Sequence, residues 1–154
     1  MQTLTKSRFT IRLAENTEGP QIAALLSKDW LSAADWDWSE VYPFWLVATA
    51  DSDIPEPSGD YTVKAGQIIG CVCTIIGKPV GFIEFLAADP DLLPHVQAKV
   101  RRLLMIQGCA SLKVHGCQFG GGNVPFGAKA FKRAMKKRGA RVVWQGNTML
   151  LRLV

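Results

Sequence analysis

Two apolar runs in the middle of the chain constrain the fold most. They are GQIIGCVCTII (66–76) and KPVGFIEFLAAD (78–89), and only Gly77 separates them. Ile is frequent in the first run and Val, Ile and Phe occur in the second, so we predict two buried strands joined around Gly77. Cys71 and Cys73 lie two residues apart, which places both thiols on one face of their strand. We expect them to be reduced and to pack as small hydrophobic side chains.

Other strands and helices are predicted from the spacing of apolar residues. Alternating Phe9, Ile11 and Leu13 indicate a first strand over 8–14. Further strands are expected at 45–51, 111–119, 140–146 and 147–154. Four helices are predicted. The first is capped by Asn16 or Thr17, and the second is a short helix or turns in the Trp-rich 29–45. The third runs from Pro94 to Gln107 and is ended by Gly108, and the fourth runs from Pro125 to Arg138 with Phe131, Ala134 and Met135 on its inner side.

The predicted order is β-α-α-β-β-β-α-β-α-β-β, a mixed α/β sheet of about seven strands with four helices. With 154 residues and 48% hydrophobic content, the chain is expected to form one domain over 1–154. No run approaches the roughly 18 apolar residues of a membrane span. Residues 1–15 lack the apolar core of a secretory signal, so we expect a cytoplasmic protein that does not bind membranes.

Charge is divided unevenly along the chain. All 13 acidic residues lie at or before Asp91 with only six of the 18 Lys and Arg, so residues 1–91 carry a formal charge of −7. Residues 92–154 contain no Asp or Glu and carry +12. The last predicted helix presents one basic face, formed by Lys129, Lys132, Arg133 and Lys136. The asymmetry favours a polyanionic partner, and a solvated basic face is an equal alternative.

Histidine and cysteine spacing does not indicate a metal site. His95 and His115 are the two histidines, and the four cysteines contain no C-x-x-C pair. A zinc site would need widely scattered ligands. We therefore expect no bound metal.

The element order over nearly the whole chain resembles the GNAT fold of the GCN5-related N-acetyltransferases. FTIRLAENTEGPQIAALL (9–26) resembles that family's opening strand and helix, and residues 66–92 resemble its central hairpin and fourth strand, which ends in an A-x-D-P turn. AMKKRGARVV (134–143) resembles the end of its last helix and its sixth strand. DWSEVYPFWLVA (37–48) looks more like small acetyltransferase-like proteins of bacteriophages, for which the location would be the host cytoplasm or a virion.

The resemblance implies transfer of an acetyl group from acetyl-CoA to an amine. The family holds the CoA pyrophosphate on a glycine-containing loop after its fourth strand, and here that place is DPDLLPHVQAKVRR (89–102), which has no glycine. The resemblance implies that Gln97 is the polar residue of the loop and that the side chains of His95, Lys99, Arg101 and Arg102 contact phosphate. It implies that the backbone N–H groups of Leu86, Ala87 and Ala88 contact the thioester. Asn123 resembles the Asn that opens the family's last helix and is the remaining implied CoA contact.

Glu84, on the presumed fourth strand, is the candidate catalytic base. Its apolar neighbours would raise its pKa and let it take a proton from the amine, unless it faces solvent or pairs with a basic helix. The family's usual acid, a Tyr four residues before the glycine that ends the last helix, corresponds to Met135, which cannot donate a proton. The aromatic residues that would form an acceptor wall, or else fill the core, are Trp36, Trp38, Tyr42 and Trp45.

A glycine-rich segment precedes the last helix. Gly122-Asn-Val-Pro-Phe-Gly-Ala-Lys129 resembles a phosphate-binding P-loop, but its Lys is one position late and no Ser or Thr follows. We interpret the segment as a bend.

Two further functions stay open: a non-catalytic GNAT-like domain, virion-associated in a phage, whose basic half contacts DNA or an acidic protein, and a simple nucleic-acid-binding module. Oligomeric state is not predicted.

Overall fold

The computed structural model describes residues 8–29, 44–55, 62–123, 128–144 and 148–153. Their elements, in chain order, are β1 (Phe9–Leu13), a short 3-10 helix (Asn16–Glu18), α1 (Gly19–Asp29), β2 (Trp45–Ala50), β3 (Ile54–Pro55), β4 (Thr62–Val63), β5 (Ile68–Ile75), β6 (Val80–Ala88), α2 (Pro94–Val114), β7 (Phe119–Asn123), α3 (Lys129–Lys137), β8 (Arg141–Trp144) and β9 (Thr148–Arg152).

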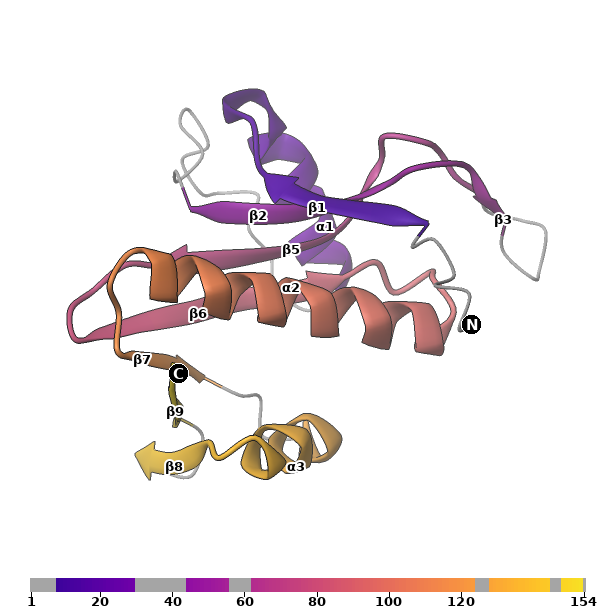
Figure 1. Ribbon diagram of the computed structural model, residues 1–154. Coiled ribbons are helices and arrows are strands. Elements are labelled where there is room, and N and C mark those ends of the chain that lie inside the picture. Colours follow the sequence, from indigo (N-terminus) through magenta and orange to yellow (C-terminus); the bar gives the residue numbers. More distant parts are fainter. Residues whose placement is uncertain (1–7, 30–43, 56–61, 124–127, 145–147, 154) are drawn as a thin grey trace, which may run out of the picture.

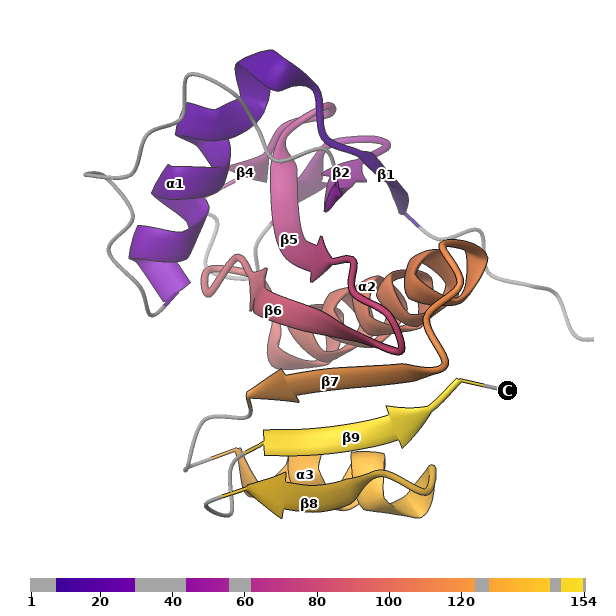
Figure 2. The ribbon, with the colours of Figure 1, turned by 90° about the vertical axis from the view of Figure 1, so that its left-hand side faces the viewer.

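Seven strands form one sheet in the order β1-β2-β5-β6-β7-β9-β8, which confirms the predicted seven-stranded mixed sheet (Figures 1 and 2). Neighbouring strands are antiparallel, with the exception of the parallel pair β6 and β7. Parallel neighbours need a long crossover, and α2 provides it here. β3 and β4 form a separate two-stranded ribbon.

The helices cover both faces of the sheet. On one face, α1 packs Ile22 and Leu26 against a layer that includes Cys71 and Cys73, as expected for two thiols on one side of a strand. On the other face, α2 is buried against Ile69, Val72 and Ile83 through its Val100, Leu104 and Leu112. A third cluster joins α3 to β9 and to Met105 of α2, so α2 and α3 share a face.

Helix α2 is longer than predicted. It continues through Gly108 to Val114, so Gly108 does not end it, and 111–114 are helical rather than part of a strand. Gly108 is buried against Thr74 and Ile83, where a Cβ would make ordinary contacts of 3.4 Å with both side chains. The helix continues past this glycine because its apolar packing on the sheet extends to Leu112.

The glycine-rich segment is also different from the prediction. Gly122 and Asn123, where the predicted bend begins, lie in β7 with Gly120 and Gly121, between β6 and β9, and 124–127 lie outside the described residues. A Cβ on Gly122 would lie 2.8 Å from the carbonyl oxygen of Ile83, so glycine permits the close approach of these strands. Helix α3 is described from Lys129, and its Ala134 is exposed rather than on the inner stripe.

The predicted count of four helices and the predicted order need correction. The described residues hold three α-helices, and the order gains the short strands β3 and β4 between β2 and β5. The predicted second helix falls mostly in residues 30–43, outside the described part. The first helix is preceded by a 3-10 turn whose N-cap is Glu15 rather than Asn16 or Thr17. Of the described helices, none is long and apolar enough to cross a membrane.

Candidate functional site

Strands β6 and β7 separate before β6 ends. Their pairing extends over Val80–Phe82 and Phe119–Gly121, after which β7 stays paired with β9 while β6 continues to Ala88. Beyond the separation, one edge of β6 has no partner strand among the described residues. This edge offers backbone N–H and C=O groups to a ligand, because strand edges carry unpaired hydrogen-bonding groups.

A bulge in β6 lies at this separation. Cys71 pairs with Ala87 and Cys73 with Glu84, so β6 holds one more residue than β5 in this interval. Phe85, inside the bulge, has φ of 56°, a left-handed conformation that is unusual for a bulky residue. Backbone strain of this kind is maintained by the surrounding fold and is typical of functional sites.

The bulge and the alternation of the strand set the direction of the N–H groups. The Asp89 N–H donates to Ile69 O across β5 at 2.9 Å, whereas the Ala88 N–H points the other way and donates to Asp29 Oδ2 at 3.3 Å. Successive amides of a regular strand point to opposite sides, so we expect the N–H of Leu86, two residues before Ala88, to lie on the side of the Ala88 N–H. Leu86 itself is one of the bulged residues.

Glu84 is half-buried where the two strands separate. Burial raises the pKa of its carboxyl, and hydrogen bonding to Asn123 opposes part of that rise. The Asn123 Nδ2 lies 3.5 Å from Glu84 Oε1, and the Asn123 Oδ1 accepts from Thr148 Oγ1 at 2.9 Å. A chain of three polar side chains therefore connects β6, β7 and β9, with Glu84 at its end.

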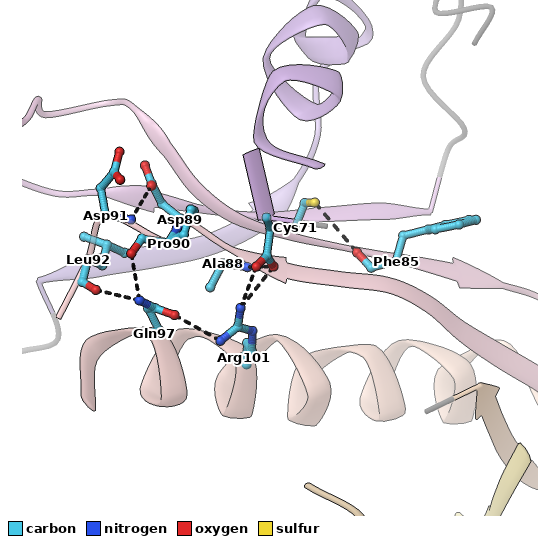
Figure 3. Close-up of polar contacts among 10 residues, drawn as sticks. Cys71, Phe85, Ala88, Asp89, Pro90, Asp91, Leu92, Gln97 and Arg101 are labelled. Carbon is cyan, nitrogen blue, oxygen red and sulfur yellow. Dashed lines mark hydrogen bonds and ion pairs between the residues drawn. The ribbon is translucent and has the colours of Figure 1, made fainter. Parts of the chain in front are cut away.

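A second polar cluster lies at the other end of β6 (Figure 3). Gln97 Nε2 donates to Pro90 O at 3.0 Å and to Leu92 O at 2.6 Å, and Arg101 donates to Gln97 Oε1 at 3.2 Å. The same guanidinium donates to both carboxylate oxygens of Asp29, at 3.1 and 3.0 Å. These bonds fix the 89–97 loop to the first turns of α2.

Lysine and aspartate side chains complete this cluster. Lys28 of α1 donates to Asp89 Oδ1 at 2.9 Å and also forms an ion pair with Asp91. Asp89 is 2% exposed, and its Oδ1 also accepts the Asp91 N–H at 3.0 Å. Three carboxylates, those of Asp29, Asp89 and Asp91, therefore surround the loop. Lys28 and Arg101 balance two of these three charges, so the cluster keeps one more carboxylate than cation.

Solved structures share the fold of this chain, although no family model and no curated protein matches the sequence. N-acetylglutamate synthase from Neisseria gonorrhoeae, complexed with coenzyme A and L-arginine, matches 97% of this chain with a TM-score of 0.70 and 15% identity; the match spans 34% of that protein. YhbS from Escherichia coli, a GNAT family N-acetyltransferase in complex with CoA, matches 100% of this chain and 86% of its own, with a TM-score of 0.63 and 21% identity. The chain has the GNAT fold. The ribosomal-protein-S18-alanine N-acetyltransferase of Escherichia coli agrees, with a TM-score of 0.65, 15% identity and 94% of both chains covered.

β6 is the strand that the sequence analysis expected as the fourth of a GNAT fold, and 89–102, the segment expected to contact CoA, forms the connection after β6 and the first turns of α2. Gln97 and Arg101, two of the predicted CoA contacts, instead bond to the loop and to Asp29. His95, Lys99 and Arg102 are exposed, and Lys99 Nζ lies 5.8 Å from the centre of the Phe9 ring. Proline at the first position of α2 removes one backbone donor from the helix N-terminus.

The predicted acceptor wall is described only at Trp45. This residue is 4% exposed and stacks on Phe85, with 6.0 Å between ring centres. Trp45 therefore packs in the core beneath α1, in agreement with the alternative that these rings fill the core. Trp36, Trp38 and Tyr42 lie outside the described residues. No group of three potential metal ligands occurs within the described ranges.

Several residues of both clusters were absent from the sequence-based predictions. Asp29 contacts Arg101 across 72 positions and Ala88 across 59, and Lys28 contacts Asp89 across 61. Thr148 reaches Asn123 across 25 positions. No local motif connects residues so far apart, so only the pairing of the strands and helices could reveal these contacts.

Proposed function

We propose that this protein is an N-acetyltransferase that moves the acetyl group of acetyl-CoA to an amine. The observation that supports this most is the bulge at Phe85, where β6 leaves β7. It places an open backbone edge and a half-buried carboxyl, Glu84, next to each other. The GNAT fold and the CoA-bound neighbours agree with this function.

In the proposed reaction, Glu84 is the base. A carboxylate with a raised pKa is a better proton acceptor, so Glu84 takes the proton from an ammonium group and frees the amine lone pair. The amine nitrogen bonds to the thioester carbonyl carbon and the C–S bond breaks. The second proton, which the nitrogen must lose to become an amide, passes to the departing sulfur, and Glu84 releases the first proton to solvent. The N–H of Leu86 faces the developing negative charge on the carbonyl oxygen. Asn123 and Thr148 orient the Glu84 carboxyl.

The phosphate end of acetyl-CoA would be held differently from the usual loop. Gln97 and Arg101 already bond to the protein, so the available cations are the exposed side chains of Lys99 and Arg102, with His95 nearby. Exposed cations give weaker, salt-sensitive contacts with phosphate. We therefore expect CoA to bind in the micromolar range or more weakly, with strong dependence on salt.

The second candidate function is a non-catalytic GNAT-like domain, and one contact favours it. Asp29 Oδ2 accepts a hydrogen bond from the Ala88 N–H. The resemblance to acetyltransferases implied that this N–H would contact the thioester of acetyl-CoA. An internal carboxylate that occupies this edge is compatible with a scaffold or interaction role. Association with a phage virion, and a cytoplasmic location, remain predictions from the sequence.

Calorimetric titration with CoA and acetyl-CoA at 50 mM and 200 mM salt, followed by an assay with small amines, tests the two functions. Saturable binding, weakened at least about 10-fold by Lys99→Ala with Arg102→Ala, supports the acetyltransferase. The control is Lys113→Ala, an exposed lysine at the other end of α2. Absence of heat at millimolar ligand would reject acetyl-CoA as substrate and leave the interaction domain.

A further inference from the structure

Helix α3 carries an unbalanced positive charge. Its nine residues include Lys129, Lys132, Arg133, Lys136 and Lys137 and no acidic residue, and 92–154 contains none either. These five side chains line one shallow depression of about 550 Å³. Their spacing of three and four residues places them along one side of the helix.

This charge arrangement disfavours the helix when it stands alone. Lys129 and Arg133, Lys132 and Lys136, and Arg133 and Lys137 are like-charged pairs four residues apart, which repel each other. Lys129 also opens the helix, where the macrodipole favours negative charge. Local rules of this kind are typically broken at functional sites, where a bound partner removes the repulsion.

The described structure provides no compensating carboxylates for most of this face. The five ion pairs among the described residues involve Arg12, Lys28, Lys64 and Arg101. Lys129, Arg133, Lys136 and Lys137 take part in none of them. These four cations of α3 therefore form no ion pair with a carboxylate of the described residues.

The apolar side of α3 faces the protein. Met135 is buried with Met149 and Ala140, and Phe131 packs against the same cluster. None of the large exposed hydrophobic side chains of the described residues belongs to α3. A folded protein partner depends on apolar and aromatic anchors at the centre of its interface, and this face has none.

We propose that the basic face of α3 binds the phosphodiester backbone of nucleic acid without reading its sequence. A polyanion needs no apolar anchor, because release of its condensed counterions drives the binding. Lys129 and Lys137 are about 12 Å apart along the helix, given the helical rise per residue. One strand of a duplex presents a phosphate about every 3.4 Å along its axis, so the face spans about three phosphates. The proposal is independent of acetyl transfer, since it uses no residue of the β6 edge.

Fluorescence anisotropy with a labelled 20-base-pair duplex and its single strand, measured from 25 to 200 mM salt, tests this proposal. The test variant is Lys129→Gln, Arg133→Gln and Lys137→Gln. The control removes the same charge elsewhere with Arg8→Gln, Lys78→Gln and Lys113→Gln, which are all exposed. Circular dichroism checks that both variants keep the helix content of the parent.

We expect the α3 variant to bind at least about 10-fold more weakly than the parent. The magnitude of the slope of log K against log salt should fall by about 3. The control variant should change the affinity less than about 3-fold. Equal losses in both variants would assign binding to net charge and overturn the proposal. Absence of binding at 25 mM salt would do the same. Polyglutamate that competes as well as single-stranded DNA of equal charge would instead indicate an acidic protein partner.

Discussion

Arg101 of α2 donates two hydrogen bonds to Asp29, the last residue of α1, although the two helices cover opposite faces of the sheet. The Asp29 carboxylate also accepts the Ala88 N–H, so the contact holds both helices to the end of β6. A carboxylate at a helix C-terminus is unfavourable, because the macrodipole places negative charge there. Arg101 offsets this, which explains why an arginine implied to bind CoA is bonded within the protein.

Loss of this ion pair should destabilise the fold. The Asp29 side chain is 12% exposed and that of Arg101 is 32% exposed, so the pair is partly shielded from solvent. Arg101→Met leaves the carboxylate without its cation, and we expect the free energy of unfolding to fall by about 1.5–3 kcal/mol. Urea denaturation measures this change. Arg102→Met, at the exposed neighbouring position, should stay within about 0.5 kcal/mol of the parent.

A double-mutant cycle separates the pair from other effects. Asp29→Asn and Arg101→Met together should cost less than the sum of the two single changes, with a coupling free energy of at least about 0.5 kcal/mol. Additive effects would show that the two residues stabilise the fold independently.

Glu84→Gln should reduce acetyl transfer by about 100-fold or more while leaving CoA binding unchanged, because the amide cannot accept a proton. The activity of the parent should rise with pH through the raised pKa of Glu84, since the base must be ionised. A pH–rate profile of both proteins measures this. Equal activity of the variant, or a parent profile without this ionisation, would remove Glu84 from the mechanism.

Glu84→Gln should make the folded protein more stable at pH 7, although it lowers activity. Burial raises the pKa of Glu84 in the folded state, so the folded protein holds this proton more tightly than the unfolded chain does. Ionisation therefore disfavours folding as pH rises above the ordinary Glu value of about 4.3. Urea midpoints should show Glu84→Gln to be more stable than the parent at pH 7, and the difference should vanish near pH 3, about one unit below that value.

Two glycines should respond oppositely to alanine. Gly122→Ala places a methyl group 2.8 Å from the Ile83 carbonyl oxygen, which the backbone cannot easily move away, and should destabilise the fold by about 1–3 kcal/mol. Gly108→Ala meets side-chain atoms at 3.4 Å and improves the helix propensity of α2. We expect it to stabilise the fold by up to about 1 kcal/mol. Thermal or urea unfolding measures both, and a neutral Gly122→Ala would contradict the close strand packing.

The cysteines should differ in their reaction with a thiol reagent under native conditions. Burial raises the pKa of the Cys71 thiol and raises that of Cys73 to about 12, so both should stay unmodified at pH 8 until the protein unfolds. Cys117 is buried and should behave likewise, whereas half-buried Cys109 should react first. Mass spectrometry of the labelled peptides identifies the sites. Rapid native labelling of Cys71 or Cys73 would contradict their place beneath α1.

The sequence predicted those parts of the fold that local periodicity encodes. Apolar alternation predicted β1, and two continuous apolar runs predicted β5 and β6, each within about two residues. The place of Cys71 and Cys73 on one face followed from strand geometry. The prediction from sequence failed at Gly108, which does not end its helix, and at Gly120–Gly122, which lie in a strand. Glycine is typical of helix ends and bends, but the packing of α2 on the sheet carries the helix past Gly108, and Gly122 lets β7 approach β6. Both effects arise from neighbours distant in the sequence.

The candidate site shows the same division. Sequence alone determined that Glu84 lies on a central strand among apolar residues and that the 89–102 loop has no glycine. Only the tertiary structure decided that β6 leaves β7 beside Glu84, that Gln97 and Arg101 bond to the loop and to Asp29, and that Ala88 donates to Asp29. The reason is physical: periodicity records which face of an element is buried, whereas contacts across 59 or 72 positions depend on how the elements pack.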